Sequence, residues 1–189
     1  MWPLGHAAVA YLLYSLSHRG RFDAPPELGP LVALAVGSQF PDLVDKPLAW
    51  YLGQLPTGRT LAHSLLVLVP LSVLVVLVAR RYDRTEYGVA FGVGALSHAT
   101  VDALPVLWNE DASADFLLWP LVSVEAYEEG APSVVSLFLD SLSEPYFLSE
   151  FVLAAVAFAL WRRDGSPGLE RLVAIVGRTR RMVVDGADP

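Results

Sequence analysis

Two pairs of residues in this sequence have the types and the spacing of metal ligands. Asp42 and Asp45 stand three positions apart after an apolar run, and such a carboxylate pair suits bidentate or bridging contact with an ion. His98 and Asp102 are four positions apart, so on a helix they share one face and can bind the same ion. The chain has no cysteine, so any metal must be held by histidine nitrogen and carboxylate oxygen.

Three more polar residues extend this set. His6 lies near the start of the chain, and Arg59 and His63 again have the four-residue spacing of a helix face. The planar guanidinium of Arg59 suits a substrate phosphate or carboxylate. We therefore expect Asp45 and Arg59 to take part in catalysis. The expected metal ligands are His6, Asp42, Asp45, His63, His98 and Asp102.

This ligand chemistry narrows the metal. Nitrogen and oxygen ligands without sulfur suit Zn²⁺ first, with Mn²⁺ or Fe²⁺ as alternatives. Several carboxylates also allow two ions, which would lower the pKa of bound water and hold both the attacking and the leaving oxygen in a hydrolysis.

Each residue also has an ordinary explanation. His6 can be a polar residue at a helix start, Asp42 a helix cap, His63 an interfacial side chain, and His98 a hydrogen-bond partner of Asp102. Ionisable side chains within apolar helices are costly and mostly functional, however. The combination therefore favours a metal site over separate structural roles.

The composition indicates a membrane protein. The 189 residues are 54% hydrophobic and 17% charged, against about 25% charged in soluble domains. The net charge of −7 argues against a nucleic-acid partner, and leaves membrane lipids and a small-molecule or lipid substrate as the expected partners. Lys46 is the single lysine, and an acidic chain poor in lysine and cysteine is typical of salt-loving organisms, an archaeal-like composition.

The apolar runs predict an all-α fold: a polytopic membrane bundle of about five helices with a re-entrant or interfacial segment. We expect Pro41 to end the second helix, which leaves Asp42 and Asp45 in a loop. The expected helices cover residues 3–16, 28–40, 61–79, 86–104 and 148–161, and the interfacial segment covers 116–121. Residues 1–161 would form the membrane-embedded domain and 162–189 a basic cytoplasmic tail with an interfacial helix.

Arginine positions predict the orientation of this bundle. Arginines cluster at 19–21, 80–84 and 162–181, and residues 85–161 contain neither lysine nor arginine. Cytoplasmic segments of membrane proteins are rich in such residues. The predicted protein therefore lies in the cell membrane with several spans, with its N-terminus and its candidate metal ligands toward the extracytoplasmic side.

Several short motifs occur in the order found in a known family. They are Gly5-His6, Pro41-Asp42-Leu43-Val44-Asp45, Arg59-Thr60-Leu61-Ala62-His63-Ser64, Ser97-His98 with Asp102, and Leu118-Trp119-Pro120. In these motifs the chain resembles the membrane-bound metal-dependent hydrolases, which include LexA-binding inner-membrane proteins and are distantly similar to zinc-dependent phospholipase C. The resemblance covers residues 1–121. It departs where members usually carry threonine before the histidine and this chain has Ala62.

Two classes of function remain open from the sequence. The first is a membrane-embedded metal-dependent hydrolase of a phosphoester or lipid-like substrate. The second is a non-enzymatic metal-binding scaffold or a transporter. A transporter needs polar residues along a path through the membrane, and the inner halves of the third and fourth predicted helices are apolar.

Overall fold

The computed structural model describes residues 1–126, 133–171 and 174, and this part of the chain is helical without strands. The α-helices are α1 (Pro3–Phe22), α2 (Leu28–Trp50), α3 (Leu65–Arg81), α4 (Thr85–Ala103), α5 (Val134–Ser141) and α6 (Pro145–Arg163), and the short 3-10 turns are η1 (Leu104–Leu107) and η2 (Asp115–Leu118). The all-α prediction is thus confirmed. The predicted interfacial helix of the tail lies almost entirely outside the described residues.

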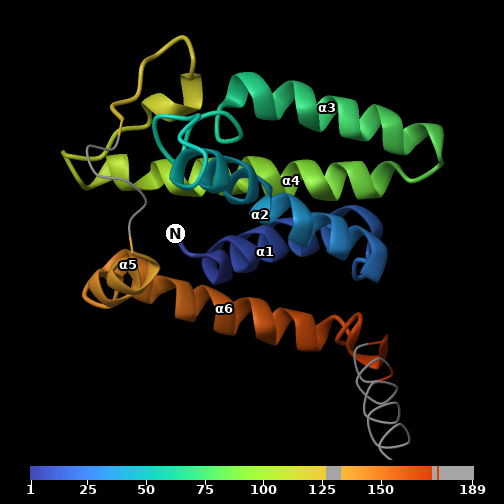
Figure 1. Cartoon of the computed structure of the whole chain (residues 1–189). Helices are drawn as coiled ribbons and strands as arrows, with labels where there is room; N and C mark the ends of the chain where they lie inside the picture. Colours follow the sequence, from blue (N-terminus) through green and yellow to red (C-terminus); the bar gives the residue numbers. More distant parts are fainter. Residues whose placement is uncertain (127–132, 172–173, 175–189) are drawn as a thin grey trace, which may run out of the picture.

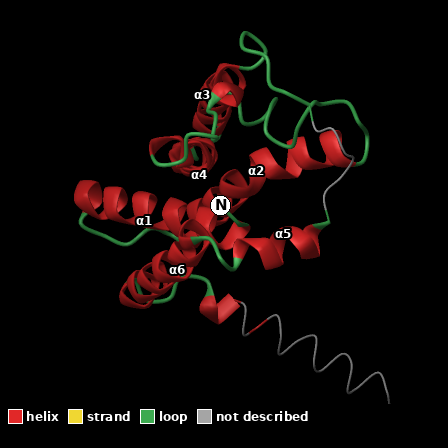
Figure 2. Ribbon diagram, turned by 90° about the vertical axis from the view of Figure 1, so that its left-hand side faces the viewer, coloured by secondary structure: helices red, strands yellow, loops and turns green. Residues whose placement is uncertain are grey.

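Helix α4 occupies the centre of the bundle. It packs against α1, α2 and α3, while α6 packs along the outer side of α1 (Figure 1). The loop after α2 and the segment that carries η1 and η2 lie at the C-terminal end of α4. The N-terminus of the chain lies at the same end (Figure 1). The turned view in Figure 2 places α5 beside this same end of the molecule. The polar residues singled out in the sequence meet at this end.

The prediction that Pro41 ends the second helix is wrong. Helix α2 continues through Pro41 and Pro47 to Trp50, so Asp42 and Asp45 lie on its last turns. Proline removes one helical hydrogen bond but does not abolish the helix when other contacts hold the next turn. Here Lys46 donates to Asp42 at 2.6 Å from one turn further on, which supports the helix beyond the proline.

Helix α3 begins later than expected, at Leu65. Ser64 is its N-cap, and its hydroxyl accepts a hydrogen bond from the backbone N–H of Leu66 at 3.2 Å. Arg59 and His63 therefore lie in the loop before the helix and not on a shared helix face. Helix α5 was not predicted from the sequence at all, and α6 begins at Pro145, three residues before the expected start.

Glycines bring α2 and α4 into backbone contact. A Cβ atom at Gly94 would lie 2.5 Å from the carbonyl oxygen of Leu34 and 2.6 Å from the backbone nitrogen of Ser38. A Cβ atom at Gly37 would lie 2.2 Å from the carbonyl oxygen of Phe91. No side chain fits at either point, so the two helices lie as close as their backbones allow.

Among the residues that the structure describes, two helical segments are long and apolar enough to cross a membrane, Thr85–Leu107 and Pro145–Arg163. The five-span bundle remains a prediction, since α1, α2 and α3 are not among these segments and α3 has only 17 residues. Large apolar side chains nevertheless face outward, among them Val73, Leu74 and Leu77 on α3 and Val152 and Phe158 on α6. This arrangement suits a lipid environment.

Candidate metal centre

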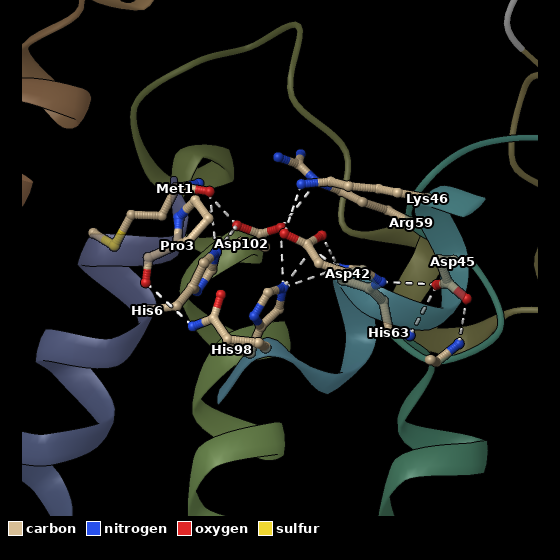
Figure 3. Close-up of polar contacts among 12 residues, drawn as sticks. Met1, Pro3, His6, Asp42, Asp45, Lys46, Arg59, His63, His98 and Asp102 are labelled. Atoms are coloured by element: carbon tan, nitrogen blue, oxygen red, sulfur yellow. Dashed lines mark hydrogen bonds and ion pairs between the residues drawn. The ribbon is translucent and has the colours of Figure 1, made fainter. Parts of the chain in front are cut away.

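Side chains from four separate segments converge at the end of α4. They are His6 on α1, Asp42 and Asp45 on α2, Arg59 and His63 in the following loop, and His98 and Asp102 on α4 (Figure 3). The three histidines are 0 to 1% exposed and Asp102 is 5% exposed. A buried group of this kind needs either mutual hydrogen bonds or an ion to compensate its lost hydration.

The imidazole of His63 is oriented by Asp45. The Nδ1 atom of His63 lies 2.8 Å from Oδ2 of Asp45, and the same carboxylate accepts backbone N–H bonds from Thr60 at 2.8 Å, Ala62 at 2.8 Å and His63 at 3.2 Å. Because a carboxylate only accepts, Nδ1 carries the hydrogen in this contact. The Nε2 atom of neutral His63 therefore presents a lone pair toward the centre of the site.

His98 is oriented in the same way by a backbone carbonyl. Its Nδ1 atom lies 2.7 Å from the carbonyl oxygen of Ser38 on α2, so Nδ1 is again the donor. The Nε2 atom of neutral His98 then also carries a lone pair. Histidine ligands of metals typically donate their other N–H to a carboxylate or a backbone carbonyl, as both rings do here.

Two lone pairs and two carboxylates therefore point at one small volume. The Nε2 atoms of His63 and His98 lie 3.2 Å apart. Oδ1 of Asp42 lies 3.6 Å from the first nitrogen and 3.7 Å from the second, and it is buried without a hydrogen-bond partner. Such an arrangement repels itself unless a proton or a cation lies between the atoms.

The spacing of these atoms matches a small metal ion. A tetrahedral ion with bonds of about 2.1 Å places its ligand atoms about 3.4 Å apart. The three atoms from Asp42, His63 and His98 are 3.2 to 3.7 Å apart. Oδ2 of Asp102 lies near the fourth corner, 3.7 Å from the His63 nitrogen and 3.9 Å from the His98 nitrogen.

His6 belongs to a second candidate ligand group with His98 and Asp102, whose ligand atoms lie within 4.8 Å of one another. Its ring stacks on that of His98 with centroids 3.6 Å apart, and its Nε2 atom lies 3.3 Å from Oδ1 of Asp102. The two groups share His98, whose Nδ1 is already bonded to Ser38. Only one of them can therefore use the His98 Nε2 atom at a time.

Cationic groups border the carboxylates on the side away from the histidines (Figure 3). Nε of Arg59 and the amino group of Met1 each lie 2.9 Å from Asp102, on its two different oxygens. Lys46 binds Oδ2 of Asp42, which leaves Oδ1 of that carboxylate facing the histidines. The Arg59 side chain is 47% exposed, so the cationic border is the side from which an anionic molecule can reach the site.

The pKa values at the site follow from these neighbours. Burial alone would lower the pKa of His63, but Asp42 and Asp45 outweigh it and raise the value. Burial alone would raise the pKa of Asp42, but His63, His98 and Lys46 hold it below its usual range. In metal-free protein a proton on His63 can therefore relieve the facing lone pairs, and metal binding would displace that proton.

The segment that carries η2 covers the site. Phe116 is 5% exposed and meets the ring of His63 edge to face, with centroids 6.0 Å apart. The hydroxyl of Ser64 donates to the carbonyl oxygen of Trp119 at 2.6 Å and so ties this cover to the start of α3. Ser64 and Trp119, which belong to two different sequence motifs, thus together hold the covering segment over the site.

The structure thus brings together all the predicted site residues, but not in equal positions. Asp45 lies behind His63, and both its oxygens are engaged by Thr60, Ala62 and His63. The contributors that were not predicted from the sequence include Ser38, which supplies a backbone carbonyl, and Lys46. For Lys46 a signal was present, since it follows Asp42 by one helical turn. The position of His18 between Ser17 and Arg19 predicts a solvent-exposed loop, but the residue lies on α1 with its side chain 10% exposed.

Comparison with known proteins supports a membrane location. No curated protein and no solved structure matches the chain. A model of the YdjM inner membrane protein family matches residues 1–178. This agrees with the resemblance to LexA-binding inner-membrane proteins, whereas a similarity to hydrolases or to phospholipase C is not shown. The chain belongs to the YdjM inner membrane protein family.

Proposed function

We propose that this protein is a membrane-embedded metal-dependent hydrolase of phosphoesters, small or lipid-like. One observation carries the proposal. The Nε2 lone pairs of His63 and His98 face one another at 3.2 Å beside the unpartnered Oδ1 atom of Asp42. A divalent cation is the species that turns this repulsion into bonding.

Asp42, His63 and His98 are the ligands proposed for the principal ion. Three protein ligands with an open fourth position are the arrangement of catalytic zinc sites, where the fourth ligand is water or substrate. Zn²⁺ suits this set best, with Mn²⁺ and Fe²⁺ as the alternatives. Such an ion lowers the pKa of its bound water and so supplies a nucleophile at neutral pH.

Asp102 is suited to act beside the fourth position. Its Oδ2 atom lies 3.7 and 3.9 Å from the two histidine nitrogens, close enough either to bind the ion or to accept a proton from its water. Its Oδ1 atom lies 3.3 Å from Nε2 of His6, so His6 can hold this carboxylate in place. We assign Asp45 the role of positioning His63 rather than that of a ligand.

Arg59 and Lys46 favour an anionic substrate. Both side chains border the carboxylates, and both are partly exposed, at 47% and 32%. A planar guanidinium binds two phosphoryl oxygens at once, and the lysine adds a second positive charge. These two side chains would then hold a phosphoryl group next to the residues proposed to bind the ion.

A non-enzymatic metal scaffold is the second candidate function. It is favoured by the nearness of Asp102, because four protein ligands would close the coordination sphere, as in structural metal sites. The two candidates therefore differ in whether the fourth position is open.

Metal analysis and activity assays on the same detergent-purified protein test both candidates. We expect about one bound divalent ion per chain and metal-dependent hydrolysis of a phosphomonoester or a phosphodiester. His98→Ala should lose most of the ion and the activity, whereas His18→Ala, about 18 Å away along α1 from His6, should keep both. Bound metal without hydrolysis on a broad phosphoester panel would leave the scaffold function, and the absence of metal would reject both.

A further inference from the structure

A second buried carboxylate lies outside the metal site, on a different helix. Glu150 of α6 is 1% exposed. Its Oε1 atom accepts the backbone N–H of Trp2 at 2.7 Å, and its Oε2 atom accepts that of Gly5 at 3.1 Å. These N–H groups belong to the first turn of α1, where a helix has no internal partners for them.

The start of α1 has no cap from its own sequence. Trp2 occupies the N-cap position, and its side chain makes no capping hydrogen bond. A carboxylate from α6 takes that place, and its negative charge also suits the positive end of the helix dipole. The cap therefore comes from a residue 145 or more positions away in the sequence.

Gly5 makes this contact possible. A Cβ atom at position 5 would lie 2.6 Å from Oε2 of Glu150 and 2.6 Å from the side chain of Met1. The backbone N–H of residue 5 could not meet the carboxylate at its present distance with a larger side chain there. In the Gly5-His6 motif, Gly5 thus contacts Glu150 and His6 contributes a ring to the site.

The next residue after this contact is His6. The His6 ring stacks on His98, and its Nε2 atom lies 3.3 Å from Oδ1 of Asp102. A small shift of the first turn of α1 would therefore break both contacts. Trp2 is held from the same side, where its indole N–H donates to Ser141 at 3.0 Å.

We propose that Glu150 is a positioning residue of the metal centre: it fixes the first turn of α1 and thereby holds His6 against His98 and Asp102. This inference rests on the proposed metal site. It adds α6 to the elements that build that site, although α6 contributes no ligand. It also gives a function to a residue far beyond the motifs that carry the family resemblance.

Another buried carboxylate offers a matched control. Asp164, just after α6, accepts bonds from Tyr11 at 2.5 Å and Ser15 at 2.6 Å and pairs with Arg19. It fastens α6 to α1 as Glu150 does, but at the end of α1 away from His6. A loss of packing between α1 and α6 affects both carboxylates, whereas a positioning role belongs to Glu150 alone.

The first test measures Zn²⁺ affinity of the full-length protein in detergent. Glu150→Ala should weaken binding about 10- to 100-fold, because it releases His6 from its contacts with the ligand His98 and with Asp102. Glu150→Gln keeps one carbonyl acceptor and should lie between the wild type and Glu150→Ala. Asp164→Ala should leave the affinity within about threefold, even though it loosens α6.

The second test asks whether Glu150 acts through His6. In a His6→Ala background, Glu150→Ala should weaken Zn²⁺ binding no further, because the group it positions is already gone. Independent effects that multiply would contradict the inference, as would an Asp164→Ala variant that binds Zn²⁺ as weakly as Glu150→Ala.

Imidazole NMR of metal-free protein separates this inference from the proposed function. The chain has four histidines, so a histidine-labelled spectrum is simple and His6→Ala assigns one ring. Glu150→Ala should shift the His6 signals and Asp164→Ala should not. A wild-type protein that binds no metal would reject the proposed function, while unchanged His6 signals in Glu150→Ala would reject the positioning role.

Discussion

At the scale of single residues, the second nitrogen of each histidine decides what the site can do. Asp45 and the Ser38 carbonyl each take the Nδ1 hydrogen of one ring, so both Nε2 atoms of His63 and His98 face inward. The residue types of the ligand set were predictable from sequence because histidine and aspartate are conspicuous in apolar helices. The division of roles was not, since Asp45 is held by backbone N–H groups of a loop whose path no spacing encodes.

Asp45 provides the residue-scale prediction. Asp45→Asn should keep the side-chain volume but reverse or break the contact with His63 Nδ1, so that the lone pair no longer points inward in every molecule. We expect Zn²⁺ affinity to fall about 10- to 100-fold, measured by competition with a chelator. Glu110→Gln in the exposed loop is the matched control and should bind as the wild type. An Asp45→Asn variant with unchanged affinity would contradict the positioning role.

At the scale of elements, the close contact of α2 and α4 sets the distance between Ser38 and His98. Glycines in an apolar helix are predictable sites of close helix packing, but the partner helix was not predictable from them. The sequence also placed the end of α2 at Pro41, because a lone proline is a common helix end, and it placed His63 on the third helix, with Arg59 just before its start. The first error arises because the local Lys46–Asp42 pair supports the helix beyond Pro41. The second arises because Asp45 holds the loop before α3 through backbone N–H groups 15 and 17 residues away, a contact that forms only in the folded structure.

Gly94→Ala tests this contact. The new Cβ would lie 2.5 Å from the carbonyl oxygen of Leu34, so the helices must separate. We expect unfolding free energy to fall by about 1–3 kcal/mol, together with a loss of bound metal as His98 moves away from Ser38. Gly20→Ala on α1 is the control, since a Cβ atom added there would have no neighbour within 4 Å. It should be neutral or stabilising by up to about 1 kcal/mol. Equal behaviour of the two variants in an unfolding titration would contradict the packing argument.

The contact between Asp164, just after α6, and helix α1 leads to a prediction about the pH dependence of stability. Burial alone would raise the pKa of Asp164, but hydrogen bonds from Ser15, Tyr11 and Arg19 outweigh it and lower the value below the ordinary 3.8. A lowered pKa in the folded state stabilises the protein above the ordinary value, and this contribution is lost as the pH falls through the folded-state pKa.

Asp164→Asn should therefore cost about 1–3 kcal/mol of unfolding free energy at pH 7. The difference from the wild type should shrink as the pH falls below about 4. Unfolding followed by circular dichroism at pH 7 and pH 3 measures both values. Asp111→Asn, in an exposed loop, should show no such difference, and a cost for Asp164→Asn that is independent of pH would show that its charge is not involved.

At the scale of the whole molecule, the metal site lies at one end of the bundle and the arginine-rich turn between α3 and α4 at the other (Figure 1). Membership of an inner membrane protein family fits the outward-facing apolar side chains. The all-helical class was predictable from composition and apolar runs. The number of membrane spans was not predictable, because a short apolar helix has the same sequence pattern whether it packs against lipid or against a neighbouring helix.

We propose that the site end faces the extracytoplasmic side, as the arginine distribution indicates. The chain has no cysteine, so single cysteines can report the orientation. Glu110→Cys, in the exposed segment between η1 and η2, should react with an impermeant maleimide in intact cells or spheroplasts, whereas Tyr82→Cys, in the arginine-rich turn, should react only after lysis. The reverse pattern would place the metal site on the cytoplasmic side.

The central claim is that His63, His98 and Asp42 hold one divalent ion. X-ray absorption at the zinc edge of Zn²⁺-loaded protein tests it most directly, because imidazole ligands give a distinct multiple-scattering signal. We predict four or five nitrogen and oxygen ligands at about 2.0–2.2 Å, two of them imidazoles from these rings, with one imidazole lost in His63→Ala. An all-oxygen shell, or a spectrum that His63→Ala leaves unchanged, would contradict it.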